Sequence, residues 1–432
     1  MGRGGKAENG TRKLGVFSVE EVTSHNKADD KWLIINGNIY DITTWAKKHP
    51  GGAKVISHYA GEDATDAWVA FHKDREFVQK YMKALQIGVV KEYKPSPVIQ
   101  DFRELRETVE KSGWMKINPV FFLCQFLSLV AMEVSAAATM YYYGTDWLPY
   151  MVAVLLYSTC QAQAGWTQHD YGHLSVFKSN KLNHWAHNFV IGFIKGASSH
   201  WWNFRHNQHH CKPNILKKDP DIEINYLFLL GDYLPVSWGR KKKGVMPYNF
   251  QHNYFFLLGP PLLLPIYFHL ENFYFVFKRK DWWDLMWTTL FFMKLSWVYS
   301  PLLGHWGTFW FYMLVRMVES HWFVWVTQMS HLPNEVEHDK KLDWVHLQLA
   351  TTSNAEPSTF NDWFTGHLNY QIEHHLFPTM PRHNYAKVMP LVKSLCKKHG
   401  VTYRCKTLYR SFADIYWSLK KSGQLWYDAY HE

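Results

Sequence analysis

Three histidine-containing clusters have the spacing of metal ligands. They are His169 and His173, then His206, His209 and His210, then Gln371, His374 and His375. At positions i, i+3 and i+4 of a helix, side chains share one face, so each cluster directs its imidazoles toward a single point. The seven histidines are too many for one zinc ion, whereas two iron ions fit the number and type of ligands and leave positions open for oxygen. We therefore predict a site with two non-haem iron ions.

Other metal sites can be tested on the sequence itself. A zinc protease site of the HExxH type is excluded, because the only His-Glu pair is His431-Glu432. A ferritin-like site needs paired ExxH motifs on core helices, and the single match, Glu335 to His338, falls in a polar segment. The remaining alternative is that histidine is simply frequent, since the chain has 25. This explains scattered residues such as His184 but not three clusters with ligand spacing.

A separate pair of histidines has the pattern of a haem site. His49 begins a His-Pro-Gly-Gly run, and His72 follows in a different helical segment. Gly51 and Gly52 allow the backbone to turn closely beside the first histidine, so that two imidazoles can hold one iron from opposite faces. Such an iron has no open position, and it passes electrons without binding oxygen. The alternative is a surface turn with an incidental histidine.

The composition divides the chain into elements that must position these side chains. Residues 16–93 have the pattern of a small soluble domain, in which residues 32–41 form two short strands that turn at Asn36-Gly37. Pro95 and Pro97 break the chain, and a charged amphipathic segment follows at residues 101–111. We expect a flexible tail at 1–15, the soluble domain at 16–94, a linker at 95–118 and a membrane domain at 119–432.

Five apolar segments are candidates for membrane helices. Residues 120–143 and 147–163 are long enough to cross a hydrocarbon core of about 30 Å, and they predict an antiparallel pair. Three further candidates lie at residues 254–277, 285–303 and 308–326. The histidine clusters can share metals only on one side of the membrane, so an even number of crossings must separate Arg205 from His331. We therefore predict four spans, with one of the last three segments in the interface or buried, and leave open which one.

The composition agrees with a membrane protein whose site faces a reducing compartment. Net charge is +10, and basic clusters such as residues 240–243 flank apolar segments, which predicts cytosolic loops against anionic headgroups. No recognised nucleic-acid-binding motif accompanies them, so we expect no nucleic-acid partner. The five cysteines form no CxxC pair. The first thirty residues contain no apolar signal-peptide core, so we expect insertion through internal spans.

The sequence also resembles two known families. Residues 17–90 resemble cytochrome b5, through the His49 motif together with Trp32, Trp45 and residues 61–65. The remainder resembles the membrane histidine-box desaturases, and more narrowly the front-end acyl-CoA desaturases with a fused cytochrome b5. The likeness covers nearly the whole chain, and the motifs that carry it include Trp201-Trp202-Asn203, Lys212-Pro213-Asn214, Asp219-Pro220-Asp221, Gly259-Pro260-Pro261, Glu319-Ser320-His321 and His374-His375-Leu376-Phe377-Pro378.

The resemblance implies a ligand set and a fold. It implies that His49 and His72 hold haem b, and that His331 joins the three clusters as an iron ligand. Gln371 stands where many desaturases have histidine, which is typical of front-end members, and whether it holds iron directly stays open. His367 is expected outside the ligand set. The implied fold is multi-domain, with a small α+β cytochrome b5-like domain followed by an all-α membrane domain with about four transmembrane helices and a cytosolic di-iron cap.

The resemblance implies an activity and its partners as well. The expected enzyme is an oxidoreductase that uses molecular oxygen to insert a cis double bond at carbon 5 or 6 of a polyunsaturated fatty acyl-CoA, between the carboxyl end and the existing double bonds. NADH-cytochrome b5 reductase would supply electrons and dock near Glu62, Asp63 and Asp66. We expect a multi-pass protein in the bilayer of the endoplasmic reticulum, with both termini and the site in the cytosol. The rival readings are an acyl or sphingolipid hydroxylase on the same scaffold, and a membrane-tethered haem electron carrier with structural zinc.

Overall fold

The prolines at 95 and 97 lie where the chain passes from one folded unit to the next. In the computed structural model, which describes residues 14–338 and 341–432, the first unit ends at Ser96 and the second begins at Pro97. The predicted tail at 1–15 lies almost entirely outside the described residues. Each unit has its own core, and the two are described separately below.

The first unit is built on the hairpin that the sequence predicts. β3 (Asp30–Ile35) and β4 (Asn38–Asp41) pair antiparallel, and the turn between them has Asn36 at φ 50° and Gly37 at φ 74°. Positive φ at both central residues is the turn that Asn-Gly favours, because its twist matches that of the strands. The sheet has the order β1-β5-β4-β3-β2, and its other strands are β1 (Gly15–Phe17), β2 (Asn26–Lys27) and β5 (Gln86–Val90).

Short helices complete this unit around a small apolar core. The core contains Val22, Ile34, Ile39 and Val90, which come from one helix and three strands. Consecutive residues are buried in both strands, Leu33 to Ile35 in β3 and Ile39 and Tyr40 in β4, so both faces of the sheet are covered here. The helices are α1 (Val19–Ser24), the 3-10 helix η1 (Ala46–Lys48), α2 (Ala53–Ser57), α3 (Thr65–Phe71) and α4 (Arg75–Met82).

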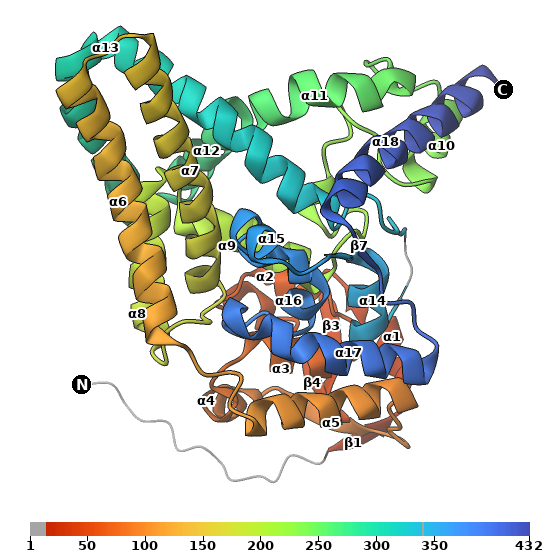
Figure 1. Ribbon diagram of the computed structural model, residues 1–432. Coiled ribbons are helices and arrows are strands. Elements are labelled where there is room, and N and C mark those ends of the chain that lie inside the picture. The colour runs from red at the N-terminus through yellow and green to blue at the C-terminus, as the bar shows by residue number, and fades with distance from the viewer. Residues whose placement is uncertain (1–13, 339–340) are drawn as a thin grey trace. The chain divides into compact units, whose positions relative to one another are not determined.

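The second unit contains the antiparallel helix pair predicted for the first two apolar segments. These helices are α6 (Pro119–Tyr143) and α7 (Trp147–Gly172), which Figure 1 shows side by side. The side chain of Asn118 caps the start of α6, and Gly144 ends it with φ 84°. α7 continues nine residues beyond the predicted apolar segment, and this extension carries the first histidine cluster out of the apolar region.

The long helix α13 (Trp282–Met329) bends sharply at Gly304, where φ is 68° and ψ is 170°. Only glycine adopts this conformation readily. The arms on either side, residues 282–303 and 305–329, run back along each other, because the ring of Tyr299 lies 4.6 Å from that of Phe311 and the ring of Phe291 lies 5.7 Å from that of Tyr312. The last two candidate segments are therefore the arms of a helical hairpin. Figure 1 shows its bend at the same end of the bundle as the turn between α6 and α7.

The candidate span at residues 254–277 is not one continuous helix. α11 (Gln251–Leu262) passes into a π-helical turn, η5 (Leu263–Phe268), before α12 (His269–Arg279) begins. Pro260, Pro261 and Pro265 lack the N–H groups that a regular α-helix needs, so the hydrogen-bond pattern changes here. Among the helices in the described part of the chain, α6 alone is both long and apolar enough to cross a membrane by those two criteria. The four-span topology stays a prediction.

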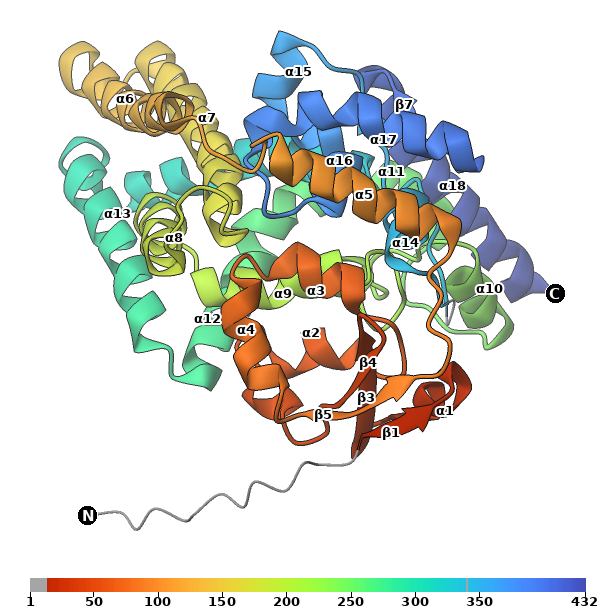
Figure 2. The ribbon, with the colours of Figure 1, turned by 90° about the horizontal axis from the view of Figure 1, so that it is seen from below.

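The remaining elements surround the helix bundle and hold the other histidine clusters. Figure 2 shows α5 (Pro97–Lys111) running beside α17 (Tyr385–His399), the helix that follows the third cluster. Both are amphipathic and pack their apolar faces together. The other helices are α8 (Asn180–His187), the π-helical η2 (Asn188–Ile194), α9 (Ser199–Cys211), η3 (Pro220–Ile222), α10 (Tyr233–Arg240), η4 (Tyr248–Phe250), α14 (Trp344–Thr351), α15 (Thr359–Phe364), η6 (Leu368–Tyr370), α16 (Gln371–Leu376), η7 (Arg382–Asn384) and α18 (Leu408–His431), and the two strands are β6 (Asn354–Ala355) and β7 (Cys405–Lys406).

Candidate haem and metal sites

His49 and His72 face each other within the first unit. Their ring centroids lie 6.2 Å apart, and the ring planes are inclined by 75°. Two imidazoles on opposite faces of one metal ion, with metal–nitrogen bonds of about 2.0–2.1 Å, would have ring centres about 6 Å apart. Nδ1 of His72 lies 2.8 Å from the carbonyl oxygen of Trp68, which can only accept, so Nε2 of His72 is free to bind a metal. The pair fits the two axial positions of a haem.

In the second unit, four segments bring the histidine clusters together. His169 lies in the last turn of α7, and His173 caps the end of that helix. α9 carries the second cluster, and Ser198 caps its start, because the Ser198 hydroxyl accepts the N–H of Trp201 at 2.9 Å. His331 follows the end of α13, and α16 carries the third cluster.

Five of the imidazoles converge on one point through their Nε2 atoms. Nε2 of His206 lies 2.8 Å from Nε2 of His173, 3.1 Å from that of His169 and 3.0 Å from that of His210. Nε2 of His374 lies 3.0 Å from Nε2 of His210. The ligand atoms of this first group all lie within 4.8 Å of one another.

A second group contains His209, His331 and His375, whose ligand atoms also lie within 4.8 Å of one another. Nε2 of His209 lies 3.3 Å from Nε2 of His331. The side-chain amide of Gln371 extends the group, with its nitrogen 2.7 Å from Nε2 of His331. Rotating the side-chain amide by 180° exchanges its nitrogen and its oxygen, which are nearly the same size. The oxygen can therefore occupy this position and face Nε2 of His331. The group thus offers three imidazoles and one amide oxygen.

Hydrogen bonds at the far side of the rings leave the Nε2 lone pairs free. Nδ1 of His209 lies 2.8 Å from a carboxylate oxygen of Asp219, and Nδ1 of His331 lies 3.2 Å from a backbone carbonyl. Nδ1 of His375 lies 2.8 Å from the amide oxygen of Gln348. Each of these oxygens can only accept, so in the neutral ring Nδ1 carries the hydrogen and Nε2 has the free lone pair. Carbonyl and carboxylate partners orient metal-binding imidazoles in this way.

Burial keeps most of these imidazoles neutral. It lowers the pKa of His206 and His210 well below the usual value and lowers that of His331 to about 3. Burial also disfavours charge on His209, but the neighbouring Asp219 carboxylate outweighs this effect and raises the pKa of that imidazole. Neutral imidazoles have the lone pairs that metal binding requires.

The two groups fit metal ions in spacing as well as in protonation. Metal–nitrogen bonds of about 2.1 Å place neighbouring octahedral ligands about 3 Å apart, and the measured separations between Nε2 atoms are 2.8 Å to 3.3 Å. Two unprotonated nitrogens gain nothing from each other at such distances, whereas a cation between them binds both. A set of imidazoles suits iron or zinc, and the donor set alone does not distinguish them.

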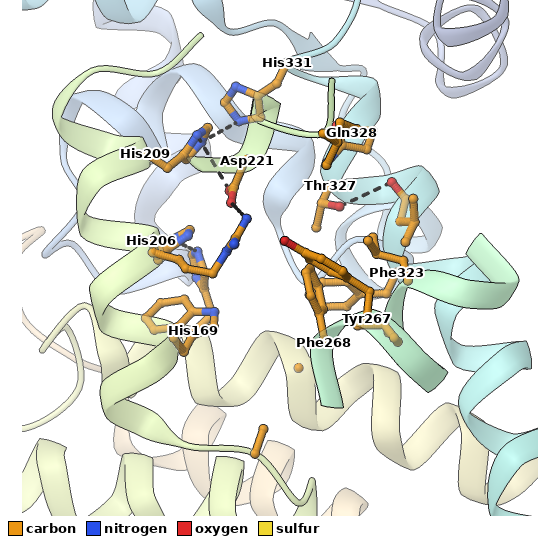
Figure 3. Close-up of a pocket in the computed structure, with 18 of the residues that line it drawn as sticks. His169, His206, His209, Asp221, Tyr267, Phe268, Phe323, Thr327, Gln328 and His331 are labelled. Carbon is orange, nitrogen blue, oxygen red and sulfur yellow. Dashed lines mark hydrogen bonds and ion pairs between the residues drawn. The ribbon is translucent and has the colours of Figure 1, made fainter. Parts of the chain in front are cut away.

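A cavity of about 190 Å³ opens beside both groups. Figure 3 shows histidines of the two groups on one side of this space and side chains of η5 and α13 on the other. Its polar wall includes His169, His206, His209, His331 and Gln371, and its apolar wall includes Phe255, Leu263, Phe268, Phe323 and Leu332. A cavity with this lining can hold a hydrocarbon chain against the imidazoles.

Some residues that orient the ligands are not marked by any sequence pattern. Gln348 links two clusters, because its amide nitrogen donates to the carbonyl oxygen of His210 at 3.0 Å while its oxygen accepts from His375. The hydroxyl of Tyr385 lies 2.9 Å from Nδ1 of His374. Gln348 lies 138 and 27 residues from its partners and Tyr385 lies 11 residues from His374, and none of these spacings is characteristic of a motif.

Other residues singled out from the sequence lie away from the two groups. His367 belongs to neither, and its ring packs 5.7 Å from that of Phe121. In the first unit, Asp63 accepts from the hydroxyl of Tyr93 at 2.7 Å and from the N–H of Thr65 at 2.9 Å. This carboxylate therefore stabilises its own unit through contacts that the sequence did not indicate.

Comparison with known proteins relates each unit to a family. The family described as "Fatty acid desaturase" matches residues 145–407, which is more than half of the chain, and "Cytochrome b5-like Heme/Steroid binding domain" matches residues 18–91. Among solved structures, cytochrome b5 of Ostreococcus tauri virus 2 is 34% identical over 19% of this chain and 99% of its own, with a TM-score of 0.17. Cytochrome b558 of Ectothiorhodospira vacuolata, titled a prokaryotic homologue of cytochrome b5, is 30% identical over 18% of this chain and 99% of its own, with a TM-score of 0.17.

Proposed function

This chain belongs to the fatty acid desaturase family and carries a cytochrome b5-like domain, and we propose that it is a front-end desaturase of polyunsaturated fatty acyl-CoA. In the proposed reaction, two hydrogens leave neighbouring methylenes and a cis double bond forms at carbon 5 or 6. The two hydrogens removed from the chain combine with one oxygen molecule, two electrons and two protons to form two waters. The observation that carries the proposal is the convergence of eight histidines into two metal-sized groups beside an apolar cavity.

We assign haem b and two irons to the sites described above. His49 and His72 would hold the haem, and the first group, His169, His173, His206, His210 and His374, would hold one iron. The second group, His209, His331 and His375, would hold the other, with Gln371 as a ligand directly or through water. When bound, the haem would supply single electrons and the irons would activate oxygen strongly enough to oxidise an unactivated chain.

The protein's own residues would orient the substrate and exclude water. The apolar wall of the cavity, which includes Phe268 and Phe323, would hold the acyl chain against the imidazoles of His169 and His206. Asp219 and Gln348 would fix the rings from behind, so that the ligand atoms need not rearrange during turnover. Basic side chains near the cytosolic surface would bind the phosphates of coenzyme A.

A topology with four spans agrees with the surface of the bundle. The proposed spans are α6, α7 and the two arms of α13, which places an even number of crossings between the second cluster and His331. α6 buries only Phe122, Leu129, Ala136 and Met140, so most of its apolar surface faces outward, as a lipid-facing helix requires. The ends of the spans opposite the histidines carry exposed aromatic side chains typical of a membrane interface, namely Tyr141, Tyr142, Tyr143, Trp147 and Trp306.

The interrupted segment formed by α11, η5 and α12 is then the one that does not span. Its π-helical turn and three prolines fit a segment that lies in the interface, where water and neighbouring helices can satisfy its backbone. With this topology, the first unit, the two groups of histidines and both termini would lie on the cytosolic side of the endoplasmic reticulum membrane. NADH-cytochrome b5 reductase would deliver electrons from the same side.

Product analysis tests this function directly. The full chain would be expressed in a desaturase-deficient yeast that is fed C18 and C20 polyunsaturated acids one at a time, and each new double bond would be mapped by mass spectrometry. We expect an added cis double bond at carbon 5 or 6, between the carboxyl end and the existing ones. A hydroxylated product would contradict the proposal and favour a hydroxylase. Metal analysis of the purified chain that found zinc in place of non-haem iron would contradict it and favour a haem electron carrier.

A further inference from the structure

A cationic cluster outside the two groups of metal-binding histidines forms part of the cavity wall. Lys195 and Arg316 both form part of the cavity wall, and both are more than nine-tenths buried, with 7% and 4% of their surfaces exposed. Both pair with Glu319, which is fully buried and lies behind the wall: Nη1 of Arg316 is 2.5 Å from Oε2, and Nζ of Lys195 contacts Oε1. Two cations share one carboxylate, so the cluster brings a net positive charge to this part of the cavity wall.

One donor of this cluster makes no hydrogen bond to any described residue. Nε of Arg316 is buried and makes no hydrogen bond within the part of the chain that the structure describes, although Nη1 of the same side chain also reaches the amide oxygen of Gln161 at 3.3 Å. A buried donor without an acceptor is destabilising, and charged groups within a membrane protein usually serve a function. Other atoms of Arg316 line the cavity, so a ligand with electron density there would lie beside this charged side chain.

The position of the cluster determines which carbons of a bound acyl chain would pass it. Nζ of Lys195 donates to the carbonyl oxygen of Gln161 at 3.1 Å. Gln161 lies eight residues before His169 on α7, and eight residues of α-helix rise about 12 Å. This distance equals several carbon–carbon bonds. In the proposed topology Gln161 lies on the membrane side of His169, away from the cytosolic surface where coenzyme A would bind. A chain whose reacting carbons lie at the histidines would therefore pass the cluster with carbons nearer its methyl end.

We propose that Lys195 and Arg316 bind the existing cis double bonds of the acyl chain and make the enzyme selective for polyunsaturated substrates. This inference rests on the proposed function. Beyond the thioester, the double bonds are the electron-rich groups of such a chain, because methylenes offer neither lone pairs nor π electrons. Cations are attracted to π electrons, more strongly away from water, and N–H donors form weak hydrogen bonds to them. Nζ of Lys195 already lies 5.5 Å from the centre of the Phe323 ring in the same wall.

A second ion pair, which is partly buried, provides the control. Nζ of Lys294 lies 2.5 Å from a carboxylate oxygen of Glu133 and joins α13 to α6. Neither residue is among those that line the cavity. If Lys195, Arg316 and Glu319 only held helices together, replacing one of these cations would have the same effect on substrate preference as replacing Lys294.

The experiment compares two acyl-CoA thioesters of equal length, one with a single cis double bond and one with two or three. Wild type, Arg316→Met, Lys195→Met and Lys294→Met would each convert a mixture of the two in membranes, and product ratios give relative kcat/KM. We expect Arg316→Met and Lys195→Met to lower the preference for the polyunsaturated chain by about tenfold, chiefly through slower conversion of that chain. Lys294→Met should keep the wild-type preference.

Haem absorbance and non-haem iron content show which variants are folded and contain their haem and iron. Arg316→Met and Lys195→Met serve as two independent tests. An unchanged preference in a loaded Arg316→Met or Lys195→Met protein would overturn the inference, as would an equal loss in Lys294→Met. If wild type itself converts neither thioester, the proposed function fails instead.

Discussion

Nδ1 of His209 lies 2.8 Å from Oδ2 of Asp219 in the buried centre of the second unit. The same carboxylate oxygen accepts the backbone N–H of Asn214 at 2.8 Å, and Asp219 is fully buried. The backbone therefore fixes the carboxylate, and the carboxylate fixes the imidazole with Nε2 directed toward the second ligand group. An acid in the loop after α9 thus sets the geometry of a histidine ten residues earlier.

Replacing Asp219 tests this link. Asp219→Asn keeps the shape of the side chain but removes its charge, so we expect metal affinity at the second group to fall by about 10–100-fold, as is typical for the partners of metal-binding histidines. Non-haem iron retained by the purified protein against a graded series of chelator concentrations measures the effect. Asp232→Asn, an exposed acid that pairs with Lys421, is the control. Equal retention by the two variants would contradict the role assigned to Asp219.

His210 lies at the centre of the first group, 3.0 Å from both His206 and His374 between Nε2 atoms. We expect His210→Ala to abolish desaturated product and to lower non-haem iron, because the remaining imidazoles cannot close the ligand shell. Haem absorbance should be unchanged. His346→Ala, which removes a partly exposed histidine paired with Asp343, should behave as wild type. Product formed by His210→Ala at the wild-type rate would remove His210 from the ligand set.

A single substitution distinguishes the role of the haem-binding histidines from that of the iron-binding histidines. His72→Ala removes one of the two rings that face each other at 6.2 Å, so we expect the haem absorbance to disappear. Product formation driven by NADH and reductase should fall to background while non-haem iron stays at the wild-type level. Spectra and iron analysis of the same sample measure both quantities. Full haem absorbance in His72→Ala would contradict its assignment as an axial ligand.

Gly304 should be necessary for the helical hairpin in α13. Its φ of 68° and ψ of 170° disfavour any side chain, although a Cβ there would meet no atom within 4 Å. We therefore expect Gly304→Ala to cost about 1–3 kcal/mol through backbone conformation alone. Thermal unfolding in detergent, with His305→Ala as an exposed neighbouring control, measures the change. An unfolding temperature equal to that of the control would show that the bend tolerates side chains.

Local sequence patterns predicted several elements of the fold. The Asn36-Gly37 turn appears as expected, because positive φ at both residues is a local property that these side chains determine. The antiparallel pair of α6 and α7 follows from two apolar runs joined by a short turn. The comparisons confirm the broad assignment, a desaturase domain with a cytochrome b5-like domain. The regioselectivity and the acyl carrier stay predictions.

Other features depend on contacts between distant residues and left no local signal. Counting crossings required two spans between the second cluster and His331, but it did not identify which segment is interrupted. The interruption at η5 depends on how prolines are accommodated by the packing around them. Gln348 and Tyr385 orient imidazoles only because the chain brings them within hydrogen-bond distance. Their residue types are common, so spacing could not identify them.

Metal analysis of the purified full-length chain tests the convergence of the imidazoles on two irons most directly. Haem would be extracted and measured separately, and total iron and zinc would be determined per mole of protein. We predict two non-haem irons and one haem for each chain, with zinc at trace level. Stoichiometric zinc without non-haem iron, or a single non-haem metal per chain, would contradict a di-iron site.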